Sequence, residues 1–538
     1  MRRRWIIGLI ASVLLLAAGF WVVFGNPFAW GQIRISHETT RITEPLDDEG
    51  HVDYVAWLNQ RYGEGVTPEN NAAVLVVQAL GPAPEGDPLP ASLFEQLGMP
   101  RPVADDKTYR PVDEFIDQIA QRAGEEATVE GDIPPVNGLD EQPPEADETP
   151  DPREKLEKQL RSALVRPWSA EDYPWLAEEV LPRNRAALDR FVEASRRSRW
   201  SVPLKPDVAL IEQIVVLQAA LRDPGQLLCA RAMHRLEAGD LDGACDDIIA
   251  VRRLGRLVRQ GPTLIDSLVG ITVGGWGIRA QAAMAHFGEL STGQRERLAH
   301  ALDDLPPPHS LAELVDEGER FTALESIQLR ARGKMAVDMS RSHKAALTTG
   351  VDWNRVLAQI NNDYDQLVSA LEPASAAARL QDTDKYYDLL SQRRRNRSIL
   401  SYTGSIISQH GRSKLVGQLI SEIMLPSAIS VNNAWNRATV YDDLAGLSLA
   451  LGAYRAKHGE YPPSLDALVP QYVDALPQDL YTEEPYRYRR TEEGCVIYSV
   501  GPNGQDNQGR AEWMPGEIDI DLLRDADDVY LYLPPLVD

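Results

Sequence analysis

The sequence predicts a chain with three parts: an N-terminal transmembrane helix, a mostly α-helical extracytoplasmic body, and a C-terminal α+β domain built from a long helix and a small antiparallel sheet. Three observations lead to this fold class. An uncharged apolar run lies near the N-terminus, apolar residues recur every three or four positions through the middle, and the last hundred residues turn to alternating, β-rich segments. A length of 538 residues is typical of two to four domains.

Residues 5–24 form the expected anchor. They carry no charge, and twenty helical residues span about 30 Å, the thickness of a hydrocarbon core. Arg2, Arg3 and Arg4 precede the run, so residues 1–4 are expected in the cytoplasm and the rest of the chain outside it. The alternative is a cleaved signal peptide, but residues 24–28 offer a poor cleavage site. We therefore expect a single-pass protein of the cell inner membrane whose bulk is periplasmic or extracytoplasmic.

The charge and the cysteines narrow the class of protein. A net charge of −25 argues against binding to nucleic acid or to anionic lipid headgroups. Three cysteines are too few for a disulfide framework. Cys229 and Cys245 could form one disulfide across a helical hairpin, although the reading as two small buried side chains is favoured.

The first soluble segment is expected at 25–123, with short helical patterns at 59–66 and 70–80. An acidic, proline-rich stretch follows at 124–153, and its composition is typical of a linker that cannot bury enough apolar surface to order itself.

The helical domain is expected at 154–430. Residues 227–258 read as two amphipathic helices joined at Gly239-Asp240, which predicts an αα-hairpin. The hairpin resembles one tetratricopeptide-type unit, but such repeats need about three copies, so an ordinary bundle is favoured. The apolar segments 264–284 and 416–431 contain charged residues and are predicted to be buried helices rather than further membrane spans.

The C-terminal domain is expected at 431–538. A helix at 439–458 has a regular apolar stripe. A short helix at 464–468 follows, then β-rich segments at 486–489 and 495–500, and then the turn Gly501-Pro502-Asn503-Gly504.

Several ordered pieces of this domain carry a family resemblance. They are Tyr454-Arg455-x-x-x-Gly459-x-Tyr461-Pro462, then Asp479 followed by Pro485-Tyr486-x-Tyr488, and then Tyr498-Ser499-x-Gly501-x-x-Gly504. Together they resemble the periplasmic domain of the major (G-type) pseudopilins of type II secretion. The resemblance implies a small antiparallel sheet packed on the C-terminal half of a long helix.

Two features of the chain depart from that family. No acidic residue follows Gly19-Phe20, where pseudopilins carry the glutamate of their processing signal. About four hundred residues separate the apolar run from the domain, whereas in pseudopilins the two form one helix. We therefore expect a large extracytoplasmic protein that contains a pseudopilin-like domain, not a pilus subunit.

The resemblance also implies a calcium site in the final loop. By order within the motif, the candidate ligands are Asn503, Asp506, Asp527 and Asp528. Carboxylate and amide oxygens are the ligands that calcium prefers. The alternative is a solvated acidic segment on a chain that is acidic throughout.

No catalytic motif stands out in the sequence. Glu313, Glu317 and Glu325 have near-helical spacing and could line a cleft, although a solvated helix face is the more common meaning of such a pattern. The favoured function is non-catalytic assembly with other envelope proteins, linked to a type II secretion or pilus-like system. The alternative is an envelope hydrolase with its active site in the helical domain, which would need two carboxylates converging in a polar cleft.

Overall fold

The structure is a computed structural model that describes residues 32–84, 86–105, 107–130, 151–206, 208–213, 217, 220–334, 350–373, 375–395, 408–509 and 528–537. The expected cytoplasmic N-terminus (1–4) and anchor (5–24) lie outside these residues, as does most of the expected linker. The first seven residues of that linker, 124–130, belong to helix α5 (Val112–Glu130) instead.

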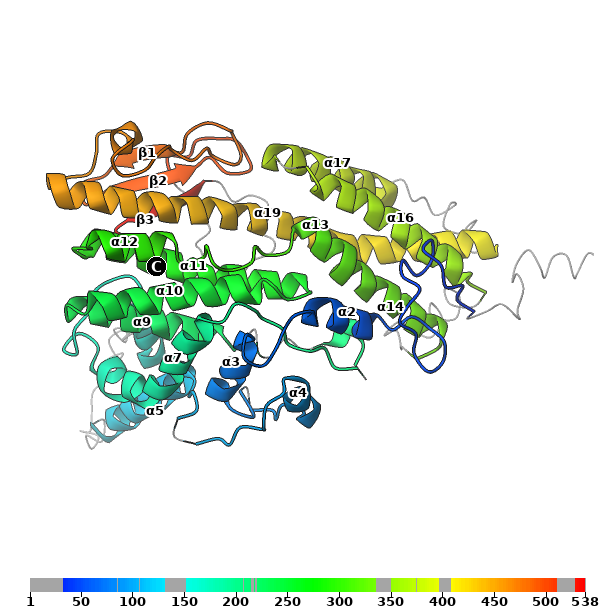
Figure 1. Cartoon of the computed structure of the whole chain (residues 1–538), viewed down its shortest axis with the longest axis horizontal. Helices are drawn as coiled ribbons and strands as arrows, with labels where there is room; N and C mark the ends of the chain where they lie inside the picture. The colour runs from blue at the N-terminus through cyan, green and yellow to red at the C-terminus, as the bar shows by residue number, and fades with distance from the viewer. Residues whose placement is uncertain are drawn as a thin grey trace, which may run out of the picture.

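The described residues are mostly helical and include one three-stranded antiparallel sheet (Figure 1). The strands β1 (Arg487–Arg490), β2 (Cys495–Ser499) and β3 (Val529–Leu533) lie in the order β1-β2-β3. Arg487 pairs with Tyr498 across the first ladder, and Cys495 pairs with Leu533 across the second. A helical body with a small antiparallel sheet near the C-terminus is therefore confirmed.

The largest hydrophobic core is formed mostly by residues 72–305. It is centred on buried leucine, alanine and aromatic side chains such as Trp168, Phe191 and Leu228. The elements around it are α3 (Ala72–Leu80), α4 (Ala91–Gln96), α5, α6 (Pro152–Ala163), η2 (Trp175–Val180), α7 (Leu181–Ser195), α9 (Arg222–Glu237), α10 (Leu241–Val258), α11 (Leu264–Phe287) and α12 (Thr292–Ala299).

The predicted αα-hairpin is confirmed as α9 and α10, which meet at the Gly239-Asp240 turn. The segment predicted to be a buried helix at 264–284 is confirmed as α11. Its glycines allow close packing, because a Cβ atom on Gly255 of α10 would lie only 2.7 Å from the carbonyl oxygen of Gly270. Cys229 and Cys245 are buried free thiols, so the disulfide between them is wrong.

A second core joins the N-terminal segment to the later helices. Tyr54, Phe321 and Tyr364 are among its largest buried side chains. The contributing elements are α2 (Tyr54–Gly63), η3 (Leu210–Glu212), α13 (Leu311–Leu314), η4 (Val315–Glu319), α14 (Arg320–Ala331), α16 (Trp353–Leu371), α17 (Ala376–Arg395) and α19 (Gln409–His458).

Helix α19 is 50 residues long and runs along the molecule (Figure 1). Its first half packs on α16 and α17, and its second half packs on α11 and carries the sheet. The predicted helix at 439–458 is thus the end of a helix that begins at Gln409 and passes through residue 430 without a break. Among the described residues, α19 alone is long and apolar enough to cross a membrane, and half of its most apolar window is buried in the protein.

The C-terminal core lies between α19, α11 and the sheet. The predicted short helix is confirmed as the 3-10 helix η5 (Leu465–Leu468), and the two predicted strands are confirmed as β1 and β2. Strand β3 was not predicted. Its residues, Val-Tyr-Leu-Tyr-Leu, alternate in the manner of a strand, but they directly follow the acidic stretch and need β2 as a partner.

Candidate functional site

The predicted calcium ligands that the structure describes lie on the loop between β2 and β3. Asp528 directly precedes β3 and is fully buried. Its Oδ1 accepts the backbone N–H of Asn507 at 3.3 Å, and its Oδ2 accepts that of Gly509 at 2.6 Å. Asp528 therefore closes the loop onto the sheet. Asp527 lies outside the described residues.

The other two predicted ligands also accept hydrogen bonds inside this loop. Asp506 accepts the Tyr498 hydroxyl at 3.0 Å and the Gln508 N–H at 2.8 Å, and Asn503 accepts the Gln505 N–H at 2.8 Å. Burial, and then the carboxylate of Asp506, raise the pKa of Tyr498 to about 12.

The fit of this loop to calcium is partial. Asp506 and Asp528 both lie near Tyr498, so the loop brings two carboxylates to one place. Within the described residues, however, no group of three or more acidic, histidine or cysteine side chains could hold a metal. Asn503 or Asp527 would have to complete the coordination.

The three glutamates selected by helical spacing do not all come together: Glu313 and Glu317 lie near each other beside Tyr62, whereas Glu325 lies near Asp53 and Glu212. Glu313 caps the start of α13, Glu317 accepts the Tyr62 hydroxyl at 3.0 Å, and Glu325 accepts the Leu210 N–H at 2.5 Å. The alternative prediction, that the three glutamates form one solvated helix face, is also wrong for Glu325. Glu325 is buried, and burial raises its pKa to about 7. Each of these acids has a structural partner.

A cavity of about 240 Å³ lies in the helical body, where the two larger cores meet. Its walls come from α4, the 202–213 segment, the start of α11, η4 with α14, and α19. Most of the lining is apolar, as at Leu93, Leu204, Leu210, Ile265 and Met424.

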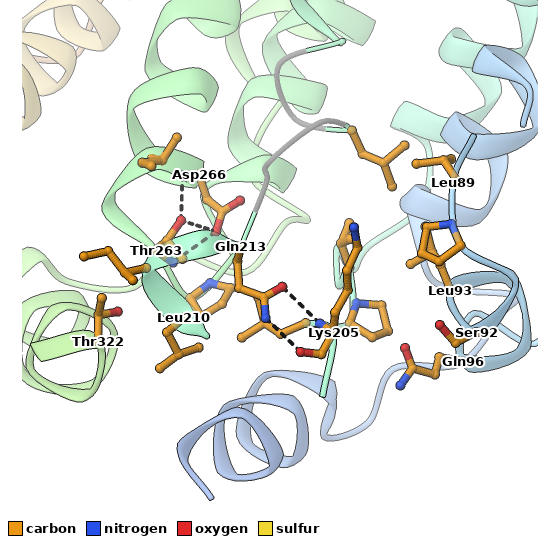
Figure 2. Close-up of a pocket in the computed structure, with 18 of the residues that line it drawn as sticks. Leu89, Ser92, Leu93, Gln96, Lys205, Leu210, Gln213, Thr263, Asp266 and Thr322 are labelled. Carbon is orange, nitrogen blue, oxygen red and sulfur yellow. Dashed lines mark hydrogen bonds between the residues drawn. The ribbon is translucent and has the colours of Figure 1, made fainter. Parts of the chain in front are cut away.

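Hydrogen bonds hold the polar side chains of this wall in place, as Figure 2 shows. The Gln213 side chain bonds both backbone groups of Lys205, accepting its N–H at 3.1 Å and donating to its carbonyl at 2.8 Å. At the start of α11, the Thr263 hydroxyl donates to Asp266 at 2.7 Å, and the Asp266 N–H donates back at 3.1 Å. This capping box occupies the Asp266 carboxylate in starting the helix.

Glu319 is the acidic residue of the cavity that sequence reasoning missed. It lines the wall beside Thr322, and burial alone raises its pKa to about 7. Among the described residues, no side chain or N–H is bonded to its carboxylate. In the sequence Glu319 stands among other acids, next to Arg320, and nothing distinguishes it from them.

The position of Glu319 depends on the π-helix η4, which it ends. Such wide turns insert one extra residue into a helix and are frequent at functional sites. The preceding residue, Gly318, lies against the carbonyl oxygen of Pro262, since a Cβ atom there would be 2.2 Å from that oxygen. Pro262 also lines the cavity, so this contact brings η4 to the cavity wall.

Comparison with known proteins gives no match: no protein family, curated protein or solved structure is similar to the chain.

Proposed function

We propose that this protein is a membrane-anchored, extracytoplasmic, non-catalytic protein that assembles with other envelope proteins, linked to a type II secretion or pilus-like system. Residues 5–24 would hold it in the inner membrane, and the domain at 431–538 would bind the partner. The observation that carries the proposal is the packing of an antiparallel sheet on the second half of α19, in the element order that the pseudopilin resemblance implies.

The surface best placed for such contacts is β1. It pairs only with β2 among the described residues, so it forms an edge of the sheet. Arg487 and Arg489 are exposed on it and make this edge basic on a chain of net charge −25. An acidic partner surface would complement this edge.

In-cell photo-crosslinking tests the proposal. A photoreactive residue at Arg489 should link the protein to another envelope protein. The same residue at Val103, which is 81% exposed in the helical body, serves as the matched control and should not give that product. Identical products from both positions, or no product from Arg489, would contradict the assembly role.

The proposed topology has its own test. A reporter that is active only outside the cytoplasm, fused after Asp538, should be active. The intact protein should also keep residues 5–24, because the chain lacks the acidic residue of the pseudopilin processing signal. Activity of a cytoplasm-only reporter at Asp538 would contradict the topology, and a mature N-terminus after residue 24 would contradict the anchor.

The alternative function, an envelope hydrolase, would place its active site at the cavity in the helical body. Glu319 is the one observation in its favour, since an acid with a raised pKa suits general acid catalysis. The second carboxylate of the cavity, Asp266, is bound to Thr263 and caps α11. We therefore favour a binding role.

A further inference from the structure

The cavity in the helical body has the size and lining of a small-ligand site. An engineered cavity of about 150 Å³ with apolar walls holds benzene, so about 240 Å³ accommodates a compact ring with one polar substituent. The walls belong to five different regions of the chain, and contacts such as that of Gly318 with Pro262 join them. Preformed apolar pockets with few polar groups are typical of ligand sites.

Glu319 is the acid of this cavity whose carboxylate accepts no hydrogen bond from the described residues, whereas Asp266 caps α11. Its neighbours in sequence differ in this respect: Asp316 forms an ion pair with Arg320 at 2.6 Å, and Glu317 accepts the Tyr62 hydroxyl. Arg320 also pairs with Asp365 at 2.7 Å, so its charge is directed away from Glu319. The Glu319 side chain is half-buried at the cavity wall, so its carboxylate is available to a donor group of a ligand.

The positive charge of Lys205 and the negative charge of Glu319 lie on different sides of the cavity. Figure 2 shows Lys205 toward the α4 residues Leu93 and Gln96, and Thr322 on the far side of Gln213. Lys205 forms no ion pair with a described residue, so it does not neutralise Glu319. The side of the cavity formed by η4 and α14 therefore carries a negative group beside an apolar surface.

We propose that this cavity binds a small organic cation with a compact apolar body, whose ammonium group is held by the carboxylate of Glu319. The apolar body would pack against Leu210, Ile265 and Met424. The ammonium would donate a charge-assisted hydrogen bond to the Glu319 carboxylate, which accepts none from the described residues. This inference does not depend on the assembly role.

The experiment compares three probes of similar shape and different charge: cyclohexylamine, cyclohexanol and cyclohexanecarboxylate. Binding is measured by calorimetry on the full-length protein in lipid nanodiscs, with empty nanodiscs subtracted. Cyclohexylamine should bind at least about tenfold more tightly than cyclohexanol, the effect of one charge-assisted hydrogen bond. Cyclohexanecarboxylate should bind most weakly.

Two matched variants locate the site. Glu319→Gln should weaken cyclohexylamine binding by about tenfold, to the level of cyclohexanol. Glu325→Gln is the control, because Glu325 has the same raised pKa but accepts the Leu210 N–H and does not line the cavity. It should leave cyclohexylamine binding unchanged.

Equal binding of cyclohexylamine and cyclohexanol to the unaltered protein would overturn the proposal, and so would the absence of any binding. Both outcomes are independent of whether a variant folds. Retained amine binding in Glu319→Gln would also overturn it. None of these results bears on the crosslinks expected from Arg489, so failure of this inference and failure of the assembly role are distinguishable.

Discussion

Asp506 and Asp528 of the C-terminal loop differ from Glu319 of the cavity in the hydrogen bonds that their carboxylates accept. Asp506 and Asp528 accept loop N–H groups and a hydroxyl, so their oxygens hold residues 506–509 against the sheet. Glu319 is half-buried, burial raises its pKa to about 7, and its carboxylate accepts no hydrogen bond from the described residues. The difference teaches that burial of an acid alone does not identify a site, because the fully buried Asp528 has a structural role. An acid with a raised pKa that the fold leaves without a partner is the stronger functional signal.

The largest expected effect is on the loop. Asp528→Ala leaves the N–H groups of Asn507 and Gly509 without their acceptor, so the C-terminal domain should lose on the order of 3 kcal/mol of stability. Hydrogen exchange should rise first at residues 501–509. Asp466→Ala is the control, since Asp466 is exposed in η5. Unchanged protection of the loop in Asp528→Ala would remove the structural role assigned to this acid.

Glu319 and Glu325, whose pKa values are raised, should make stability depend on pH. Burial raises the pKa of Glu319 and of Glu325 to about 7 from the ordinary 4.5, so the folded state holds these protons more tightly than the unfolded state. The unfolding free energy should therefore fall as pH rises from about 4.5 to about 7, by on the order of 2 kcal/mol for each acid.

Glu319→Gln and Glu325→Gln should each remove part of that pH dependence, because glutamine does not ionise. Each variant should be more stable than the unaltered protein at pH 8 and gain less at pH 5. Denaturant unfolding at the two pH values measures the unfolding free energy. If the unfolding free energy of the variants changed with pH as it does in the unaltered protein, these acids would not be shielded from water. The difference drawn between Glu319 and the loop acids would then be weaker.

The smallest expected effect concerns calcium, which we propose for the loop on the basis of the pseudopilin resemblance. Binding to the folded form alone adds about 1.4 kcal/mol at a tenfold excess over Kd. Millimolar calcium should therefore raise the melting temperature of the full-length protein slightly, and a chelator should reverse the rise. Asp506→Asn should abolish it while its side-chain oxygen still accepts the Tyr498 hydroxyl. Equal melting temperatures with calcium and with chelator would leave the loop acids with a structural role alone.

Local patterns predicted much of this fold. The Gly239-Asp240 break gave the hairpin of α9 and α10, and the charges within the apolar segment 264–284 correctly favoured a buried helix. Turn residues and alternation located η5, β1 and β2. These features depend on a few neighbouring residues, so short stretches of sequence contain the information for them.

Contacts between distant segments decided the rest. The helices predicted separately at 416–431 and 439–458 are both parts of α19, which begins at Gln409. Packing of its first half on α16 and α17 and of its second half on α11 supports one continuous helix. The role of Glu319 depends on Gly318 packing against Pro262 and on walls from α4 and α19. The sequence by itself determined where helices, turns and acids occur. Only the tertiary structure decided which acids find partners, because a hydrogen bond between residues far apart in the chain exists only once the chain has folded.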